Sequence, residues 1–365
     1  PVGEVVDRAA SLAHEAKGRE LLADATTAEL GRGRYAFRIR DDGSAHVGPA
    51  LRGSGPERSG GAPFVGRETE LSQILGAHER CRSEATSLVV SVTGPPGIGK
   101  SRLQREAIAR IASLASAPRV VVQRRDAYGR RHVLGAAADT PRALIALDKG
   151  ASAEEAARAI EEVTGPQTLK DGPQEQLQLL SRLLVNEPFP DGMNPAGARD
   201  VLWLAMTDLV SRLLEIEPIV LVMEDLQWAD TESIGWLDHL LGRSTTHPLF
   251  LLACVRPNFW PENEGRFTLR DHVRLDLKPI SKQAVRAIAE SVLGQNADPE
   301  RVESIARQAA GSPLFAEELA RLAALGRDAS HAPTIEAAIQ ASLDTLDAPS
   351  RDAVGRLSVL GLATW

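Results

Sequence analysis

The sequence predicts an α/β fold in which a parallel sheet carries a phosphate-binding loop and a helical unit follows. The first observation is an apolar, β-branched run at 88–92 that leads into the glycine-rich segment 94–101, GPPGIGKS. The second is the alternation of further apolar runs with helical segments up to about residue 275. Buried parallel strands read as continuous apolar runs, and strands that alternate with helices form parallel sheets covered on both faces.

The segment 94–101, called the phosphate loop below, has the spacing G-x-x-x-x-G-K-S between a strand and a helix. Gly97 and Gly99 let the backbone form a nest of N–H groups, where a Cβ would block a phosphate. Lys100 is expected to face the β and γ phosphates, and the Ser101 hydroxyl to ligate Mg²⁺, beside the positive end of the next helix. A structural glycine turn is the alternative, which the flanking strand and helix disfavour. The expected nucleotide contacts of the loop are Pro95, Pro96, Gly97, Ile98, Gly99, Lys100, Ser101 and Arg102.

Periodicity predicts the elements that follow the loop. Apolar residues recur at helical spacing after it, at Leu103, Ala107, Ile111 and Leu114. Further elements are expected as strands at 119–122, 219–223 and 249–254 and helices across about 140–215.

The last part of the chain is predicted to be helical. Ser281 is a suitable N-cap for a helix that ends near Leu293. Asp298 and Pro299 provide the N-cap and first position of the next helix, and Gly311 its stop. A sharp turn between helices is therefore expected at 309–315.

Composition restricts the classes of function. A length of 365 residues allows two or three domains, and a net charge of −7 argues against a general nucleic-acid or membrane surface. Two cysteines, Cys81 and Cys254, and the lack of an apolar span predict a cytoplasmic protein without disulfides or structural zinc. Because the chain begins at Pro1 without a methionine, we expect a piece of a longer polypeptide.

We expect five segments along the chain. The run 52–62, RGSGPERSGGA, has the composition of a flexible linker. The segment before it, 1–51, is too short for a good core of its own and has a helical stretch at 5–16 and a strand at 35–39. The expected segments are 1–51, the linker 52–62, the α/β unit 63–275, the helical unit 276–330 and a final piece 331–365.

Two acidic residues end the strand at 219–223, at the edge of the sheet where open α/β folds bind ligands. We assign Glu224 to Mg²⁺, directly or through water, and Asp225 to polarising the attacking water. The reverse assignment stays open, because the Glu-Asp order inverts the more common one; an ordinary strand edge is the other alternative. Arg256 follows the next strand and is a candidate for sensing the γ phosphate, with a solvated surface arginine as its alternative.

Five motifs in this order resemble the STAND branch of AAA+ ATPases, the signal-transduction ATPases with numerous domains. The likeness covers about residues 63–360. The motifs are FVGRETEL at 64–71, GPPGIGKSRL at 94–103, LVMEDLQWAD at 221–230, LLACVRP at 251–257 and AAGSPLFAEEL at 309–319.

The resemblance implies a P-loop NTPase sheet with a helical lid and a truncated winged-helix domain at 331–365. It implies adenine contacts at 64–71, a Walker B pair at Glu224 and Asp225, and a sensor arginine at Arg256. Pro313 of the GxP turn would touch the nucleotide from the lid. The expected contacts outside the loop are Phe64, Val65, Gly66, Arg67 and Pro313.

Two positions depart from the pattern of this family. Glu224 stands where Asp is more usual, and its longer side chain favours a water-mediated metal contact. Cys254 stands where a threonine is common two residues before the sensor arginine, which weakens the assignment of Arg256.

The first 40 residues are similar to the end of class III nucleotide cyclases. The similar segments are GEVVDRAASL at 3–12, GRELL at 18–22 and GRYAF at 33–37. Asp7 and Ser11 stand where that family has its catalytic Asn and Arg, which implies a degenerate, regulatory domain that lies mostly outside this chain.

Taken together, these features predict an ATP-binding, slowly hydrolysing, Mg²⁺-dependent switch in a multidomain bacterial signalling protein. The expected partners are ATP or ADP, the other domains of the same polypeptide and, when nucleotide is bound, other copies of the chain, with no membrane or nucleic acid for this fragment. One alternative is a DNA-binding, initiator-like AAA+ ATPase, since the motif at 65–68 also occurs there and a winged helix can bind DNA. The other is the regulatory part of a nucleotide cyclase.

Overall fold

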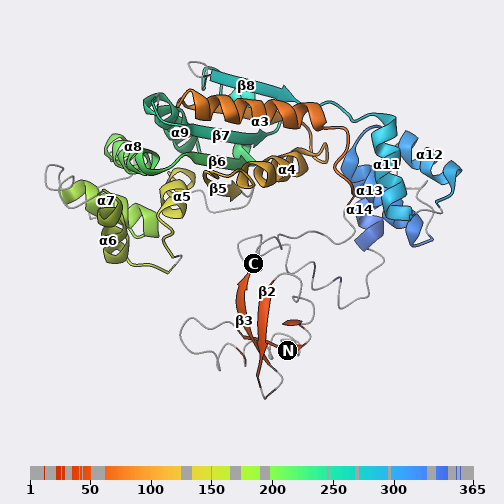
Figure 1. The fold of residues 1–365 in the computed structure, drawn as a ribbon, viewed down its shortest axis with the longest axis horizontal. Helices are drawn as coiled ribbons and strands as arrows, with labels where there is room; N and C mark the ends of the chain where they lie inside the picture. The colour runs from red at the N-terminus through yellow and green to blue at the C-terminus, as the bar shows by residue number, and fades with distance from the viewer. Residues whose placement is uncertain are drawn as a thin grey trace. The chain divides into compact units, whose positions relative to one another are not determined.

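The computed structural model divides the chain into two compact units, residues 1–62 and 63–365, which we describe separately (Figure 1). In the first unit the structure describes residues 12, 22–25, 27–28, 35–40, 42, 44–50 and 62. In the second it describes 63–124, 134–148, 150–164, 174–189, 198–244, 246–267, 271–294, 297–326, 334–343, 351 and 354.

The described part of the first unit is a small antiparallel sheet in the order β1-β3-β2. Its strands are β1 (Leu22–Ala23), β2 (Tyr35–Ile39) and β3 (Ala45–Ala50), so the strand predicted at 35–39 is confirmed. Asp42 tightens the turn between β2 and β3, since its Oδ1 accepts a hydrogen bond of 2.9 Å from the Ser44 N–H. Most of the helix predicted at 5–16, with Asp7 and Ser11, lies outside the described residues.

A five-stranded parallel sheet forms the centre of the second unit, in the order β5-β6-β7-β4-β8. Its strands are β4 (Leu88–Thr93), β5 (Arg119–Arg124), β6 (Ile219–Glu224), β7 (Leu249–Val255) and β8 (Asp271–Asp276). Four of them were predicted, and β8 was missed. Only Leu275 of β8 is buried, so this edge strand lacks the continuous apolar run of the inner ones.

Both faces of the sheet are covered, as the alternation of side chains along β4 shows. Leu88, Val90 and Val92 belong to one buried cluster with α3 (Glu68–Ser83) and α4 (Lys100–Ala112). Val89 belongs to the opposite cluster with α8 (Arg199–Ile216) and α9 (Thr231–Arg243). This three-layer arrangement confirms the predicted α/β fold (Figure 1).

The region predicted as helical at 140–215 contains several separate helices. They are α5 (Gly135–Leu144), α6 (Ala153–Thr164), α7 (Gln174–Val185) and α8. The placement of Leu114 on the helix after the phosphate loop was wrong. That helix, α4, ends at Ala112, and Leu114 lies in the following turn with 39% of its surface exposed.

A helical subdomain follows β8, and we call it the lid. It contains α11 (Lys282–Leu293), α12 (Pro299–Gln308) and α13 (Pro313–Ala324), and α14 (Ile335–Leu343), which lies in the expected final piece 331–365, packs against α13. The predicted N-caps are confirmed, since the side chains of Ser281 and Asp298 accept hydrogen bonds from the first turns of α11 and α12. Gly311 has a φ of +82° in the turn between α12 and α13, as predicted for a glycine stop.

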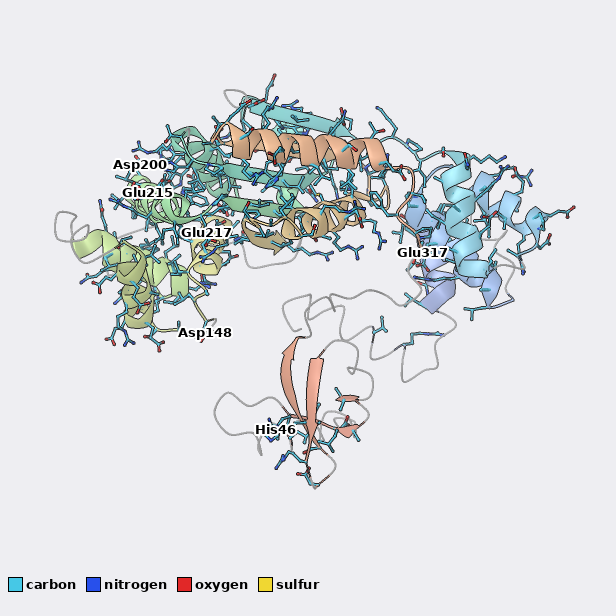
Figure 2. All side chains as sticks on the ribbon, viewed as in Figure 1. His46, Asp148, Asp200, Glu215, Glu217 and Glu317 are labelled. Carbon is cyan, nitrogen blue, oxygen red and sulfur yellow. The ribbon has the colours of Figure 1, made fainter. Side chains whose placement is uncertain are left out.

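Charged side chains cover the outside of this unit (Figure 2). Glu217, which precedes β6, pairs at 2.6 Å with Arg119 at the start of β5. Glu317 pairs with Arg321 one turn further along α13. Among the described residues, no helix combines the length and apolar character needed to cross a bilayer.

Candidate nucleotide-binding site

The phosphate loop joins β4 to α4 at the carboxyl edge of the sheet, where its glycines permit conformations that other residues rarely adopt. Gly97 and Gly99 have φ values of +77° and +102°. A Cβ at Gly94 would lie 2.7 Å from Cγ2 of Ile98, closer than unbonded carbons approach. The positive φ values of Gly97 and Gly99 confirm that the loop uses the backbone freedom of glycine at these two positions.

Lys100 folds back over the loop. Its Nζ donates hydrogen bonds to the carbonyl oxygens of Gly94 at 2.7 Å and Pro95 at 3.0 Å. Burial lowers the pKa of Lys100, while Cys254 and Asp225 act to raise it and Arg256 to lower it further. Lys100 thus lies among the residues that end β6 and β7. Ser101 and Arg102 are exposed in the first turn of α4.

Glu224 ends β6 with its carboxylate against α4. Its Oε1 accepts a hydrogen bond of 2.7 Å from Nε2 of Gln104, and its Oε2 lies 3.7 Å from Nε of Arg124. The thiol of Cys254 donates to Oε1 of Gln104 at 3.1 Å, and burial raises the pKa of this thiol to about 12. These contacts form a buried network that connects β6, α4 and β7 next to the phosphate loop.

Asp225 leaves the strand in a left-handed conformation, with a φ of +54°. Such backbone is unusual for a residue other than glycine and concentrates at functional sites. The Asp225 Oδ1 accepts a hydrogen bond of 2.9 Å from Nε2 of Gln227. Oε1 of Gln227 in turn accepts a hydrogen bond of 3.2 Å from the backbone N–H of Arg256. The guanidinium of Arg256 lies 5.3 Å from the ring centre of Trp228.

The segment before α3 meets both the sheet and the lid. Phe64 is half-buried and packs against the cluster beneath α3 and α4. Val65 is also half-buried, and Gly66 has a φ of +73°, with its Cβ position 3.0 Å from Cβ of Ala284 in α11. A side chain at residue 66 would press on Ala284 and would strain the backbone, because the positive φ favours glycine.

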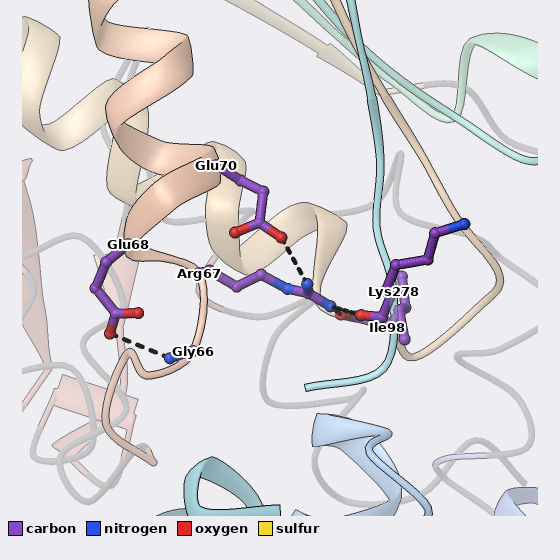
Figure 3. Close-up of polar contacts among 6 residues, drawn as sticks. All are labelled: Gly66, Arg67, Glu68, Glu70, Ile98 and Lys278. Atoms are coloured by element: carbon purple, nitrogen blue, oxygen red, sulfur yellow. Dashed lines mark hydrogen bonds and ion pairs between the residues drawn. The ribbon is translucent and has the colours of Figure 1, made fainter. Parts of the chain in front are cut away.

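The side chain of Arg67, at the end of this segment, reaches backbone carbonyls of two other parts of the chain (Figure 3). It is 5% exposed, and its Nη2 donates to the carbonyl oxygens of Ile98 at 3.2 Å and Lys278 at 2.5 Å. Its Nη1 donates to Oε1 of Glu70 at 2.8 Å. The guanidinium is therefore engaged with the protein itself.

The lid touches the phosphate loop through the start of α13. The Leu314 N–H donates to the Gly97 carbonyl oxygen at 3.3 Å, and Cγ of Pro313 lies 3.7 Å from the Cβ position at Gly99. The Ser312 hydroxyl, the N-cap of α13, is 3.5 Å from the same Gly97 oxygen. Pro313 thus lies beside the phosphate loop, and its contact with nucleotide remains a prediction.

Three further residues at this site, Gln104, Gln227 and Arg124, were not predicted from the sequence. Gln104 carried a usable signal, because it lies beside Leu103 on the face of α4 that Ala107 and Ile111 bury. A buried polar side chain on an apolar helix face requires a partner. Gln227 and Arg124 gave no comparable signal.

The residues at this edge suit a magnesium nucleotide. The loop provides glycine backbone that a Cβ would fill, with Lys100 as a nearby cation. The hydroxyl of Ser101 and the carboxylates of Glu224 and Asp225 are hard oxygen ligands of the kind that Mg²⁺ prefers.

This fold and this loop define a P-loop nucleoside triphosphatase. The sequence profile of the AAA ATPase domain matches residues 63–252, and the chain belongs to that family. A comparison with curated proteins finds no match.

Several solved structures are similar to this chain at low identity. A STAND protein with a tetratricopeptide repeat sensor from Pyrococcus horikoshii is 15% identical, with a TM-score of 0.45 over 84% of this chain. This chain spans 36% of that protein's length. The Aeropyrum pernix ORC1 protein, solved in complex with DNA, is 16% identical, with a TM-score of 0.43 over 85% of this chain and 75% of its own. The Thermotoga maritima RuvB branch migration motor is 12% identical, with a TM-score of 0.39 over 77% of this chain and 68% of its own.

Proposed function

We propose that the second unit is an ATP-dependent conformational switch, in which the nucleotide in the phosphate loop sets the position of the lid. The observation that carries this proposal is the contact between Leu314 and the carbonyl of Gly97 at 3.3 Å. Because the first turn of α13 bonds to a carbonyl of the phosphate loop, a change in the orientation of the Gly97 peptide would alter the contact that holds α13. Binding and lid position therefore share one structural element.

In this proposal Lys100 exchanges its loop carbonyls for the β and γ phosphates of ATP. Its hydrogen bonds to Gly94 and Pro95 hold the ammonium over the loop, and burial makes an anionic partner favourable. Ser101 and Glu224 would hold Mg²⁺, and the charge of that ion would neutralise the charge of the phosphates. Asp225 orients the attacking water, and its contact with Gln227 keeps the carboxylate in place.

The lid provides the mechanical output in this proposal. Pro313 lies beside Gly99, and Gly311 packs with its Cβ position 2.5 Å from Cβ of Pro279, before α11. The turn before α13 is thus packed between the phosphate loop and the residues that lead into the lid. A shift of the loop on hydrolysis would be transmitted to α11 and α13 together.

The wider role is part of the same proposal. We infer a cytoplasmic signalling protein in which the first unit, cyclase-like and regulatory, and a winged-helix domain beginning at 331–365 receive or pass on the switch. Self-association in the ATP-bound state is the expected output. The resemblance of the five motifs to STAND ATPases supports this role.

Amide hydrogen exchange tests the switch directly. We expect exchange at Leu314 to differ between the free protein, the ADP complex and the complex with a non-hydrolysable ATP analogue, because its N–H bonds to the loop. Size-exclusion chromatography with light scattering on the same samples measures self-association. Equal exchange in all three states, with binding shown by calorimetry, would contradict the proposal. A mobility shift of duplex DNA with a steep salt dependence would favour the initiator-like alternative instead.

A further inference from the structure

The buried guanidinium of Arg67 connects three segments that are far apart in the sequence (Figure 3). It bonds to Glu70 in α3, to the carbonyl of Ile98 in the phosphate loop and to the carbonyl of Lys278. Lys278 belongs to the connector, residues 277–281, which joins β8 to α11 of the lid. A buried charge is stable only while it is paired and hydrogen-bonded, so these contacts hold Arg67 in one position.

The contact with Ile98 sets the direction of a phosphate-loop amide. A peptide unit is planar and trans, so the carbonyl of Ile98 and the N–H of Gly99 point in opposite directions. Because Arg67 holds the carbonyl of Ile98, the N–H of Gly99 points away from Arg67. The contact of Leu314 with the Gly97 carbonyl acts in the same way on the N–H of Ile98.

The connector is tied to the sheet and to the lid on either side of Lys278. The Leu277 N–H donates to the carbonyl of Thr93, the last residue of β4, at 2.9 Å. The Ile280 N–H donates to the carbonyl of Gly311, in the turn before α13, at 3.0 Å. The Lys278 carbonyl lies between these two bonds, so Arg67 joins the phosphate loop to the connector at its centre.

We propose that Arg67 is a positioning residue that presents the loop amides to the phosphates and couples the loop to the lid through Lys278. This proposal gives the guanidinium of Arg67 a role beside the predicted nucleotide contact of this residue, and it rests on the switch proposed above. Coupling between two sites is reciprocal, so Arg67 should affect nucleotide affinity and lid stability together. A lysine at this position keeps the charge but lacks the planar fork that reaches two carbonyls and a carboxylate.

Two variants test the proposal, Arg67→Met and Arg67→Lys. Arg80→Met is the matched control, because Arg80 lies on the same helix in an exposed ion pair with Asp271 at 2.6 Å. Calorimetry measures ADP affinity, and hydrogen exchange measures the Ile280 and Leu314 amides at saturating ADP. For Arg67→Met we expect an affinity loss of about tenfold, the effect of one charge-assisted hydrogen bond, and loss of ADP-dependent protection at both amides. Arg67→Lys should fall between this variant and the wild type, and Arg80→Met should match the wild type.

The outcomes separate this proposal from the switch on which it rests. Wild-type ADP affinity in both Arg67 variants overturns the role of Arg67. So does full protection at Ile280 and Leu314 in both variants at saturating ADP, since a merely structural arginine would lower stability and leave coupling intact. If Arg67→Met fails to fold, Arg67→Lys decides. If the wild type shows no ADP-dependent protection, the switch is wrong, while the affinity measurement still decides the positioning of the loop amides.

Discussion

Gln104 of α4 donates a hydrogen bond of 2.7 Å to the carboxylate of Glu224, which ends β6. Gln104 follows Lys100 by one helical turn, so this bond places the Glu224 carboxylate against the helix that starts at the phosphate loop. The same amide accepts a hydrogen bond from Cys254. The orientation of the proposed metal ligand thus depends on a side chain that belongs to none of the recognised motifs.

Replacing Gln104 by Leu should weaken the magnesium-dependent part of ATP binding and lower the free energy of unfolding by about 1–3 kcal/mol, because buried polar groups lose their partners. ADP binding without Mg²⁺ should persist. Calorimetry with and without Mg²⁺ checks the first point, and urea unfolding the second. Thr207→Val is the matched control, since Thr207 accepts a buried hydrogen bond from Trp236 away from the site. Equal effects on magnesium-dependent binding in both variants would contradict the role of Gln104.

ATP or ADP should stabilise the chain, and Lys100→Ala should remove most of that effect. At about a hundred times the dissociation constant a ligand adds about 2.7 kcal/mol to the free energy of unfolding, which raises the melting temperature by several degrees. Lys100→Ala removes the cation that the loop carbonyls hold in place. Thermal unfolding with and without nucleotide is the measurement. An undiminished shift in the variant would show that this loop does not bind the phosphates.

Substitutions of Asp225 and Glu224 should affect different steps, hydrolysis in one case and magnesium-dependent binding in the other. Asp225→Asn should leave ATP binding in place and reduce hydrolysis by about 10²- to 10⁴-fold, the range for losing a general base. Glu224→Gln should weaken magnesium-dependent binding. Steady-state hydrolysis and calorimetry distinguish the two. If the effects are exchanged, Asp225 holds the metal and Glu224 acts on water. This alternative stays open because Asp225 is near enough to the phosphate loop to raise the pKa of Lys100.

Gly97→Ala should disturb the loop and the lid together. The φ of +77° disfavours any other residue, and the added Cβ would lie 3.4 Å from Cβ of Leu314 in the lid and 3.3 Å from Cδ1 of Ile335 in α14. We expect lower stability, weaker nucleotide binding and faster exchange at Leu314. Gly76→Ala is the opposite case, because Gly76 lies inside α3 with nothing within 4 Å of its Cβ position. Alanine there should stabilise the protein by about 0.5–1 kcal/mol, and similar effects at both positions would contradict the packing of Gly97 against the lid.

Stability should fall as the pH drops from about 6.5 toward 4, in part because of His272. Burial lowers the pKa of His272 from 6.5 to about 4, with Arg274 acting in the same direction. Between these values the unfolded chain binds a proton that the folded chain does not, so the free energy of unfolding decreases as the pH falls. His78, whose pKa burial also lowers, acts in the same sense. His272→Gln should reduce the slope of stability against pH in urea unfolding, and an unchanged slope would refute this contribution.

Local sequence predicted the parts of the protein that depend on neighbouring residues. The phosphate loop, the strand before it and the capped helices α11 and α12 each result from a short run of residues whose backbone preferences agree. The strand β8 escaped prediction because an edge strand with little buried surface lacks the apolar run that marks inner strands.

The sequence by itself determined the fold class, the phosphate loop and the candidate acids at the end of β6. Only the tertiary structure decided how they are connected. The contact of Gln104 with Glu224 spans 120 residues, and that of Arg67 with Lys278 spans 211. Such contacts have no local pattern, because they form only where the topology brings distant backbone and side chains together. Arg67 illustrates the difference, since its motif indicated a nucleotide contact and the fold directs its guanidinium to two carbonyl oxygens of the protein.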